Sequence, residues 1–226
     1  TFRDLVTNLI FLDPLFFISL FRAKEIAVTS NATLNLIPKI FRHKTKIFRS
    51  MGLSQIQRKK ANYKNIKKLL FVGRFVYWKG AKVALMSFYE ALKKDNELTL
   101  TFIGAGPEQS HLKKISKKLG ISKKITWINW LEQNTLIDIY GDFGIFLFPS
   151  LHDSGGLVCL EAMACGLPII CLNTGGPGRL VDKSFGSSID PFHNYKDILR
   201  EISKSILYYS SNKEIWLNAS NNAIEK

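Results

Sequence analysis

The sequence has no unbroken run of about 18 apolar residues, the length that a membrane-spanning helix requires. Residues 9–21 come closest, but Asp13 and Pro14 interrupt them, and they lack the basic start and small-residue end of a signal peptide. This stretch favours a helix that packs in a core, with an interfacial membrane helix as the alternative.

Cysteine is also scarce, and the sequence has no cluster of residues with metal-ligand spacing. The three cysteines, Cys159, Cys165 and Cys171, show no CxxC spacing, and all fall in predicted core elements. This pattern favours reduced thiols in a cytoplasmic protein over a disulfide framework or a metal site. We therefore expect neither a bound metal nor another cofactor.

Acidic residues are absent from one long window, residues 39–68, which contains eleven Lys or Arg residues. Removing these eleven charges lowers the formal net charge from +14 to +3, so the basicity of the chain is local. The window is either a solvated linker or a segment attracted to an anionic membrane surface, where each basic residue contributes about 1 kcal/mol. Nucleic-acid binding is less favoured, because few aromatic residues lie among the charges and no nucleic-acid fold signature accompanies them.

The chain from Lys68 onward alternates short, continuously apolar runs with helical patterns. Runs of this kind are typical of strands that are covered on both faces, as in a parallel sheet. The alternation predicts an α/β domain with a Rossmann-like, doubly wound parallel sheet. The expected strands are residues 69–73, 98–104, 125–129, 145–149 and 168–172, and the expected helices are 80–94, 107–119, 132–142, 156–165 and one or two from 194 onward. Two more strand-like segments, 25–30 and 45–50, precede this domain.

Small and basic residues follow three of the predicted strands. Glycines allow close approach of a ligand to the backbone, and helix N-termini offer unpaired N–H groups, so these positions together predict a polyphosphate site. The GxGxxG pattern of nicotinamide-binding enzymes is missing after the first strand, where the sequence reads GRFVYW. The candidate residues are Gly73, Arg74, Lys79, Gly104, Gly106, Ser154, Gly155 and Gly156.

Glu161 lies in the middle of an otherwise apolar helical segment, where an unpaired carboxylate would be costly. Either a Lys or Arg elsewhere in the chain pairs with it, or a ligand does. A diphosphate at the helix start would place its ribose beside Glu161, whose carboxylate can accept hydrogen bonds from both ribose hydroxyls.

The chain resembles the nucleotide-sugar-binding half of retaining GT-B glycosyltransferases, in particular the group 1 type (glycosyltransferase family 4) that builds bacterial surface polysaccharides. The segments VGRFVYWKG, FIGAGP, FPSLHDSGGLVCLEAMACGLPII and NTGGPG carry this resemblance, in that order. By this resemblance Glu161 binds the ribose, Asp153 lies at the donor sugar, and Arg74 and Lys79 hold the diphosphate. Gly155, Gly156 and Leu157 would supply backbone N–H groups. The chain departs from the family where Asp153 replaces the usual Glu and where Arg179 stands in place of an acidic residue.

The resemblance implies a glycosyltransferase of the hexosyltransferase type that transfers sugar from a nucleoside-diphosphate sugar, with retention, to a lipid-linked or saccharide acceptor. Residues 1–56 would be the tail of an amino-terminal acceptor-binding domain, 57–67 a basic linker and 68–226 the donor-binding domain of a longer enzyme. The expected location is cytoplasmic, with a peripheral position on the inner face of the plasma membrane. The alternatives are a nucleotide-binding protein without transferase activity and a basic nucleic-acid-binding protein.

Overall fold

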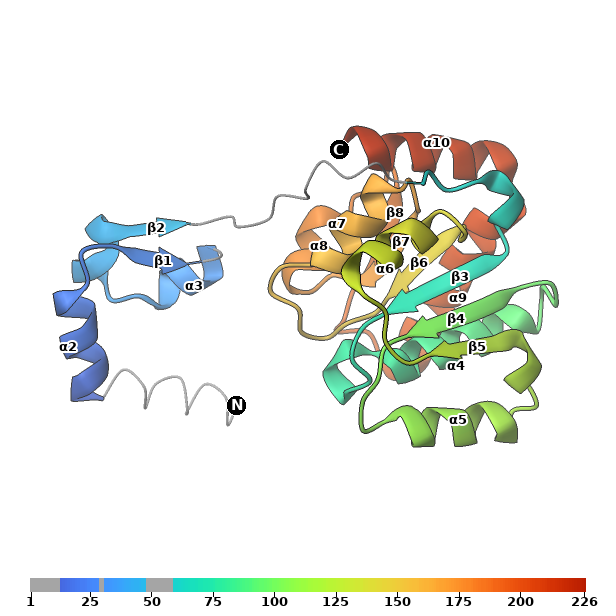
Figure 1. The fold of residues 1–226 in the computed structure, drawn as a ribbon, viewed down its shortest axis with the longest axis horizontal. Coiled ribbons are helices and arrows are strands. Elements are labelled where there is room, and N and C mark those ends of the chain that lie inside the picture. Colours follow the sequence, from blue (N-terminus) through green and yellow to red (C-terminus); the bar gives the residue numbers. More distant parts are fainter. Residues whose placement is uncertain (1–12, 29–30, 48–58) are drawn as a thin grey trace. The chain divides into compact units, whose positions relative to one another are not determined.

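The computed structural model describes residues 13–28, 31–47 and 59–226, and the chain divides into two compact units, Thr1–Gly52 and Leu53–Lys226 (Figure 1). The identity of the first unit and the boundaries of the linker stay predictions. Among the described residues, no helix combines the length and the apolarity needed to cross a bilayer.

The first unit contains a short parallel strand pair with helices around it. Its elements are α2 (Pro14–Arg22), β1 (Ile26–Val28), α3 (Asn31–Leu36), the 3-10 helix η1 (Lys39–Lys44) and β2 (Thr45–Ile47). Helix α2 begins at Pro14 because the Asp13 carboxylate accepts a hydrogen bond from the Leu15 amide at 2.9 Å and proline is favoured at the first helical position. Leu20 and Phe41 are buried in a small core, so the predicted packing helix is present from Pro14 onward. Residues 9–12, 29–30 and 48–50 of the predicted elements lie outside the described residues.

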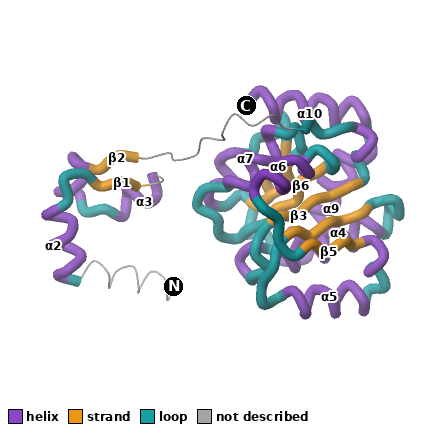
Figure 2. The backbone as a smooth tube through the Cα atoms, viewed as in Figure 1, coloured by secondary structure: helices purple, strands orange, loops and turns teal. Residues whose placement is uncertain are grey.

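The second unit contains a six-stranded parallel sheet in the order β5-β4-β3-β6-β7-β8. Its strands are the orange segments in the larger unit of Figure 2. The strands are β3 (Lys68–Val72), β4 (Thr99–Ile103), β5 (Ile125–Ile128), β6 (Ile145–Phe148), β7 (Ile169–Leu172) and β8 (Gly186–Ile189). Strands β6 and β7 are buried along their whole length, as expected for strands between two helix layers. The prediction of a doubly wound parallel sheet is therefore confirmed.

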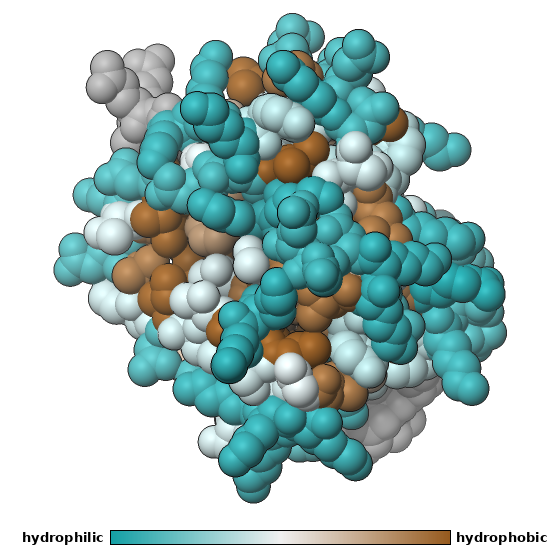
Figure 3. Space-filling view, turned by 90° about the vertical axis from the view of Figure 1, so that its right-hand side faces the viewer, coloured by the Kyte–Doolittle hydropathy of each residue, from teal (hydrophilic) through white to brown (hydrophobic). Residues whose placement is uncertain are grey.

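Helices cover both faces of this sheet (Figure 1). Helix α4 packs against α9, and α6 packs against α7. The helices are α4 (Ala81–Leu92), α5 (Gln109–Lys118), α6 (Gln133–Tyr140), α7 (Leu157–Ala164), α8 (Gly175–Leu180), α9 (Tyr195–Ser211) and α10 (Lys213–Glu225). On the face seen in Figure 3, hydrophilic side chains dominate and apolar ones form small patches between them.

The strand order reverses between β3 and β6, which lie side by side at the centre of the sheet. From β3 the chain proceeds outward through β4 and β5, whereas from β6 it proceeds outward through β7 and β8. The chain therefore leaves β3 and β6 toward opposite edges of the sheet, and the carboxyl ends of two such strands are where doubly wound folds bind ligands.

Residues 59–67, part of the predicted linker, pack against the second unit. The Ala61 amide donates to the Cys165 carbonyl at 2.7 Å, and Lys59 forms an ion pair with Asp142. The 3-10 helix η2 (Tyr63–Asn65) leads directly into β3. This part of the basic window therefore belongs to the folded second unit.

Candidate functional site

A pocket of about 410 Å³ opens at the reversal point of the sheet. It is formed by the ends of β3 and β6, the loop after each of them, and the start of α7. Most of the predicted site residues meet here. Its lining is Val72, Gly73, Arg74, Lys79, Phe148, Asp153, Ser154, Gly155, Gly156, Leu157 and Val158.

The loop after β3 and the start of α8 hold the loop after β6 in place. The Trp78 carbonyl accepts hydrogen bonds from the Leu151 amide at 2.8 Å and from the Ser150 hydroxyl at 3.0 Å, which ties it to the loop after β3. From the other side, the Gly176 amide donates to the Asp153 carbonyl at 2.8 Å. A β-carbon on Gly175, whose φ is +53°, would lie 2.0 Å from the same carbonyl oxygen, so only glycine fits this close approach.

The Asp153 side chain occupies the donors at the start of α7. One carboxylate oxygen accepts from the Gly155 amide at 3.1 Å and from the Gly156 amide at 2.6 Å, and the other pairs with Lys79. Burial acts to raise the pKa of Asp153, but the Lys79 ammonium and the two amides outweigh it and hold this pKa below its usual value. Asp153 is therefore an ionised carboxylate bound by the same groups that were predicted to bind a diphosphate.

The two predicted cations differ in their surroundings. Lys79 is largely buried, with its ammonium 5.6 Å from the centre of the Phe148 ring and paired with Asp153. Arg74 is exposed at the pocket edge, and its side chain makes no hydrogen bond or ion pair within the part of the chain that the structure describes. Arg74 is thus free to meet an anion without giving up an internal contact.

Glu161 is almost fully buried, 3% exposed, and does not line the pocket. It forms no salt bridge to a Lys or Arg among residues 13–28, 31–47 and 59–226, which removes the ion-pair alternative for these residues. Its carboxylate instead accepts hydrogen bonds from Gln133 and from the Tyr140 hydroxyl, the latter at 2.9 Å. Sequence reasoning missed both partners, because Tyr140 falls on the apolar face of α6 and Gln133 is an ordinary polar residue at the start of that helix.

Gly104 and Gly106 are close to the pocket but do not line it. A β-carbon on Gly104, with φ +136°, would lie 2.1 Å from the Gly73 carbonyl oxygen, and one on Gly106 would lie 2.5 Å from the Phe75 carbonyl oxygen. Both glycines therefore let the loop after β4 pack against the loop after β3, a structural role that accounts for their presence.

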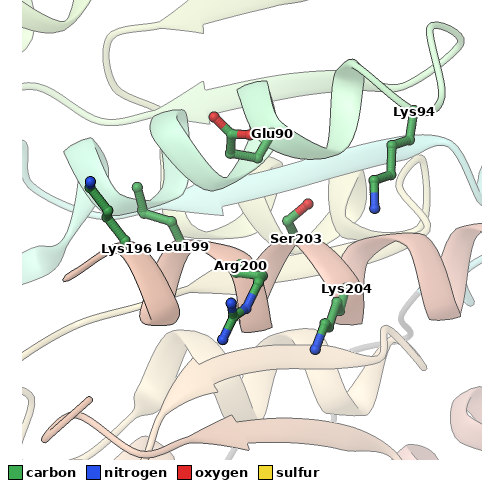
Figure 4. A pocket seen from close by; sticks show the side chains of 7 residues that line it. All are labelled: Glu90, Lys94, Lys196, Leu199, Arg200, Ser203 and Lys204. Atoms are coloured by element: carbon green, nitrogen blue, oxygen red, sulfur yellow. The ribbon is translucent and has the colours of Figure 1, made fainter. Parts of the chain in front are cut away.

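A second cavity of about 450 Å³ lies between α4 and α9 and contains none of the predicted residues (Figure 4). Its cations are partly neutralised by acidic residues of α9: Arg200 pairs with Asp197 at 2.6 Å and Lys204 with Glu201 at 2.9 Å. Its lining is Glu90, Lys94, Lys196, Leu199, Arg200, Ser203 and Lys204. This groove is a solvated charged surface between two helices.

Metal-ligating side chains do not cluster in the described part of the chain: no three His, Cys, Asp or Glu residues lie close enough together to hold an ion. The charges that the pocket itself offers to a ligand are those of Arg74, Lys79, Asp153 and the start of α7.

Curated relatives of the chain include several glycosyltransferases. The D-inositol 3-phosphate glycosyltransferase of Rhodococcus jostii is 35% identical over 118 residues, which are 49% of this chain and 26% of that protein. An uncharacterized glycosyltransferase of Haemophilus influenzae is 28% identical over 155 residues, or 68% of this chain and 42% of that protein. The chain thus spans less than half the length of these two relatives.

Solved structures share the fold at low sequence identity. The pneumococcal O-GlcNAc transferase GtfA, in complex with UDP and GlcNAc, superposes with a TM-score of 0.77 at 21% identity, covering 94% of this chain and 43% of that one. The C-terminal domain of a glycosyl transferase group 1 family protein from Francisella tularensis gives a TM-score of 0.61 at 22% identity, with 70% and 82% coverage.

The family model described as glycosyl transferases group 1 matches residues 54–222, which make up most of the chain and include the whole pocket. Together with the parallel sheet and its reversal point, this match places the pocket in the Rossmann-like domain of a GT-B glycosyltransferase. The chain therefore belongs to the glycosyl transferases group 1 family.

Proposed function

We propose that the chain binds a nucleoside-diphosphate sugar in the pocket at the reversal point of the sheet and supplies the donor half of a retaining glycosyl transfer. The observation that carries this proposal is the meeting, in one pocket, of Arg74, Lys79 and the amides at the start of α7. Two basic side chains and the positive end of a helix dipole form a site for a doubly charged leaving group.

The developing charge on the diphosphate would be met by Lys79, Arg74 and the Gly155 and Gly156 amides. Such preorganised donors are generally a large part of catalysis when a charged group departs. In the free chain Asp153 holds most of these donors, so the diphosphate must displace its carboxylate from them. A diphosphate carries more negative charge than one carboxylate, which favours the exchange.

Glu161 is proposed as the ligand of the ribose hydroxyls. It sits in the second turn of α7, the helix whose start would hold the diphosphate. Each carboxylate oxygen has one protein donor and retains capacity for another hydrogen bond. Of the two partners of Glu161, only Gln133 is exposed. A ribose would therefore reach this buried carboxylate by displacing the Gln133 side chain.

Several features of the solved structures support a nucleotide sugar as the donor. The pneumococcal enzyme was solved with UDP and GlcNAc, and a similar Anabaena protein with UDP and glucose. We propose a saccharide or lipid-linked acceptor, a place for this chain within a longer enzyme, and a reaction that needs no bound metal, because Arg74, Lys79 and the start of α7 carry the required charge. Unchanged transfer in the presence of EDTA would support the last point, and its loss would contradict it.

The basic window is proposed to bring the enzyme to an anionic membrane surface at the cytoplasmic face. Within the window Lys39, Lys46, Lys60 and Lys64 are exposed. Binding to anionic vesicles that fades as salt rises would support this, because salt screens surface charges beyond about 8 Å. Equal binding to neutral vesicles would contradict it.

Calorimetric titration with uridine, guanosine and adenosine diphosphates, NAD and an oligonucleotide tests the donor assignment against its alternatives. We expect one nucleoside diphosphate to bind, and Lys79→Gln to weaken that binding by at least about tenfold, as loss of a charge-assisted contact would. Lys94→Gln, in the groove between α4 and α9, is the matched control and should leave the affinity unchanged. Preference for NAD or for the oligonucleotide would overturn the proposal.

A further inference from the structure

Glu161 is held by two side chains of helix α6 that differ in their exposure. Tyr140, at the end of α6, is fully buried and donates to one carboxylate oxygen at 2.9 Å. Gln133, at the beginning of α6, is exposed and donates to the other oxygen. The two oxygens are thus held by different residues, one beneath the protein surface and one at it.

Tyr140 is itself fixed by packing. Its ring lies 5.8 Å from that of Phe146 in β6, and its hydroxyl also lies 3.5 Å from the Val158 carbonyl in α7. Burial and the neighbouring Glu161 charge raise the pKa of Tyr140 well above its usual value, so the phenol keeps its proton and remains a donor. A rigid neutral donor of this kind orients a carboxylate without removing its charge.

A purely structural role would not need this arrangement. An ionised carboxylate in a buried site is costly when its donors are neutral, and a buried apolar side chain would pack between α6 and α7 without that cost. The arrangement is useful if ligand binding requires a negative charge at Glu161 and a fixed orientation of its carboxylate. Each carboxylate oxygen can accept a further hydrogen bond, and the two hydroxyls of a ribose would supply one to each.

From these contacts, and resting on the proposed donor function, we infer that Tyr140 is a positioning residue for ribose recognition: it fixes the Glu161 carboxylate from within the core. Gln133 acts as a placeholder: it donates a hydrogen bond to the outer carboxylate oxygen of Glu161, and a ribose hydroxyl replaces it when the nucleotide binds. Neither residue touches the reacting atoms. Tyr140 acts through Glu161, and its removal should loosen recognition of the ribose while the diphosphate contacts at Lys79 and the start of α7 persist.

The test compares a nucleoside diphosphate with its 2′,3′-dideoxy analogue, using the nucleoside that binds in the titration above. The wild-type chain should favour the ribose form by at least about tenfold, the effect of losing charge-assisted hydrogen bonds. Tyr140→Phe should reduce this ratio at least about threefold while the affinity for the dideoxy analogue stays nearly constant. Gln133→Ala should keep or raise the wild-type ratio, because it removes only the group that a ribose hydroxyl would displace.

Tyr209→Phe is the matched control, because Tyr209 is also buried and hydrogen-bonded, to Ser187, but lies on α9. It should leave the ribose ratio unchanged. As a second measurement, Glu161→Gln is compared with Glu161→Gln/Tyr140→Phe: equal ratios support action through Glu161, and a further loss in the double variant contradicts it.

The outcomes separate this inference from the proposed function. A wild-type ribose ratio that survives in Tyr140→Phe overturns the positioning role and leaves the donor assignment standing. A ratio that falls equally in Gln133→Ala overturns the placeholder role. Failure of every nucleoside diphosphate to bind the wild-type chain overturns the proposed function, and this inference with it.

Discussion

Asp153 binds, in the free chain, the donors that a diphosphate would need. Its carboxylate accepts from the Gly155 and Gly156 amides and pairs with Lys79. Such a contact orders the loop that forms the pocket and makes the carboxylate a competitor of an incoming anion. The prediction that Asp153 lies at the donor sugar therefore requires its carboxylate to leave these amides when the donor binds.

Replacing Asp153 by Asn tests this competition. The amide keeps the shape but loses the charge that holds Lys79, so nucleoside-diphosphate affinity should rise, by about threefold to tenfold if one charged contact is released. Calorimetric titration measures the change. Asp182→Asn is the matched control, because Asp182 likewise accepts from a backbone amide, that of Ser184, and pairs with a lysine, Lys226, outside the pocket. Unchanged or weaker binding by Asp153→Asn would contradict the competition.

Glu161 gives a second prediction for a single residue. Glu161→Gln preserves the volume of the side chain and lets Tyr140 keep a hydrogen-bond partner, so the fold should survive. Binding of a nucleoside diphosphate should fall at least about tenfold, because each charge-assisted hydrogen bond contributes about 1.5 to 3 kcal/mol. Glu201→Gln, on the exposed face of α9, serves as the control. Wild-type affinity in Glu161→Gln would remove the ribose assignment.

The three cysteines are buried and none of them forms a disulfide within the described residues, which bears on the prediction of reduced thiols. Burial raises the pKa of Cys171 to about 12, although a hydrogen bond with Ser188 opposes the shift, and it raises the pKa of Cys159 well above its usual value. Thiols that stay protonated and inaccessible react slowly. A thiol reagent at about pH 8 should therefore label none of them in the folded protein and all three after unfolding; rapid labelling of the folded protein would contradict the burial.

At the scale of elements, helix α10 packs on the domain through four buried residues, of which Trp216 has the largest side chain; the others are Ala219, Ser220 and Ala223. The Trp216 indole is 1% exposed and donates to the Gly144 carbonyl at 2.6 Å, just before β6. The helix begins at Lys213 because the Asn212 side chain accepts from the Glu214 and Ile215 amides. Trp216 thus anchors the last helix to the strand that leads into the pocket.

Trp216→Phe should lower the free energy of unfolding by about 2 to 4 kcal/mol, because it leaves a cavity and an unpaired buried carbonyl. Urea denaturation followed by circular dichroism measures this change. Trp130→Phe is the matched control, since Trp130 is 73% exposed, and should change stability by less than about 0.5 kcal/mol. Equal effects of the two substitutions would show that Trp216 does not anchor α10.

Elements whose residues carry a strong local pattern were predictable from the sequence. The continuous apolar run that forms β6, for example, is typical of a buried strand, and the glycines ahead of α7 indicate a helix start. Strand β8 and helix α8 were not predicted. The segment GSSI of β8 has little β propensity and forms a strand because it pairs with β7 at the sheet edge, which is a tertiary effect.

The same limit applies to the candidate site. Loop residues that follow strands could be assigned to one edge of the sheet, because parallel strands end there together, and Gly73, Lys79 and Gly156 indeed meet. Contacts between separate helices could not be predicted from the hydrophobic pattern of the sequence. Tyr140 and Glu161 are 21 positions apart, and their hydrogen bond depends on how α6 packs against α7.

For the whole molecule, the central expectation is donor binding without transfer. The described pocket lies wholly in the second unit, and the chain spans 42% or less of the two curated relatives compared above. Transfer requires an acceptor hydroxyl aligned with the anomeric carbon, and such positioning can account for about 7 to 11 kcal/mol of the barrier lowering. This chain alone should bind a nucleotide sugar and show no appreciable transfer to lipid-linked or saccharide acceptors. Robust transfer by the chain alone would contradict this expectation.

The most direct test of the account is a crystal structure of the chain with the nucleoside diphosphate that binds it. The account predicts the phosphates on Lys79, Arg74 and the amides at the start of α7, the Asp153 carboxylate displaced from those amides, and the ribose on Glu161. A nucleotide bound in the groove between α4 and α9, or one in the pocket with its ribose turned away from Glu161, would contradict it.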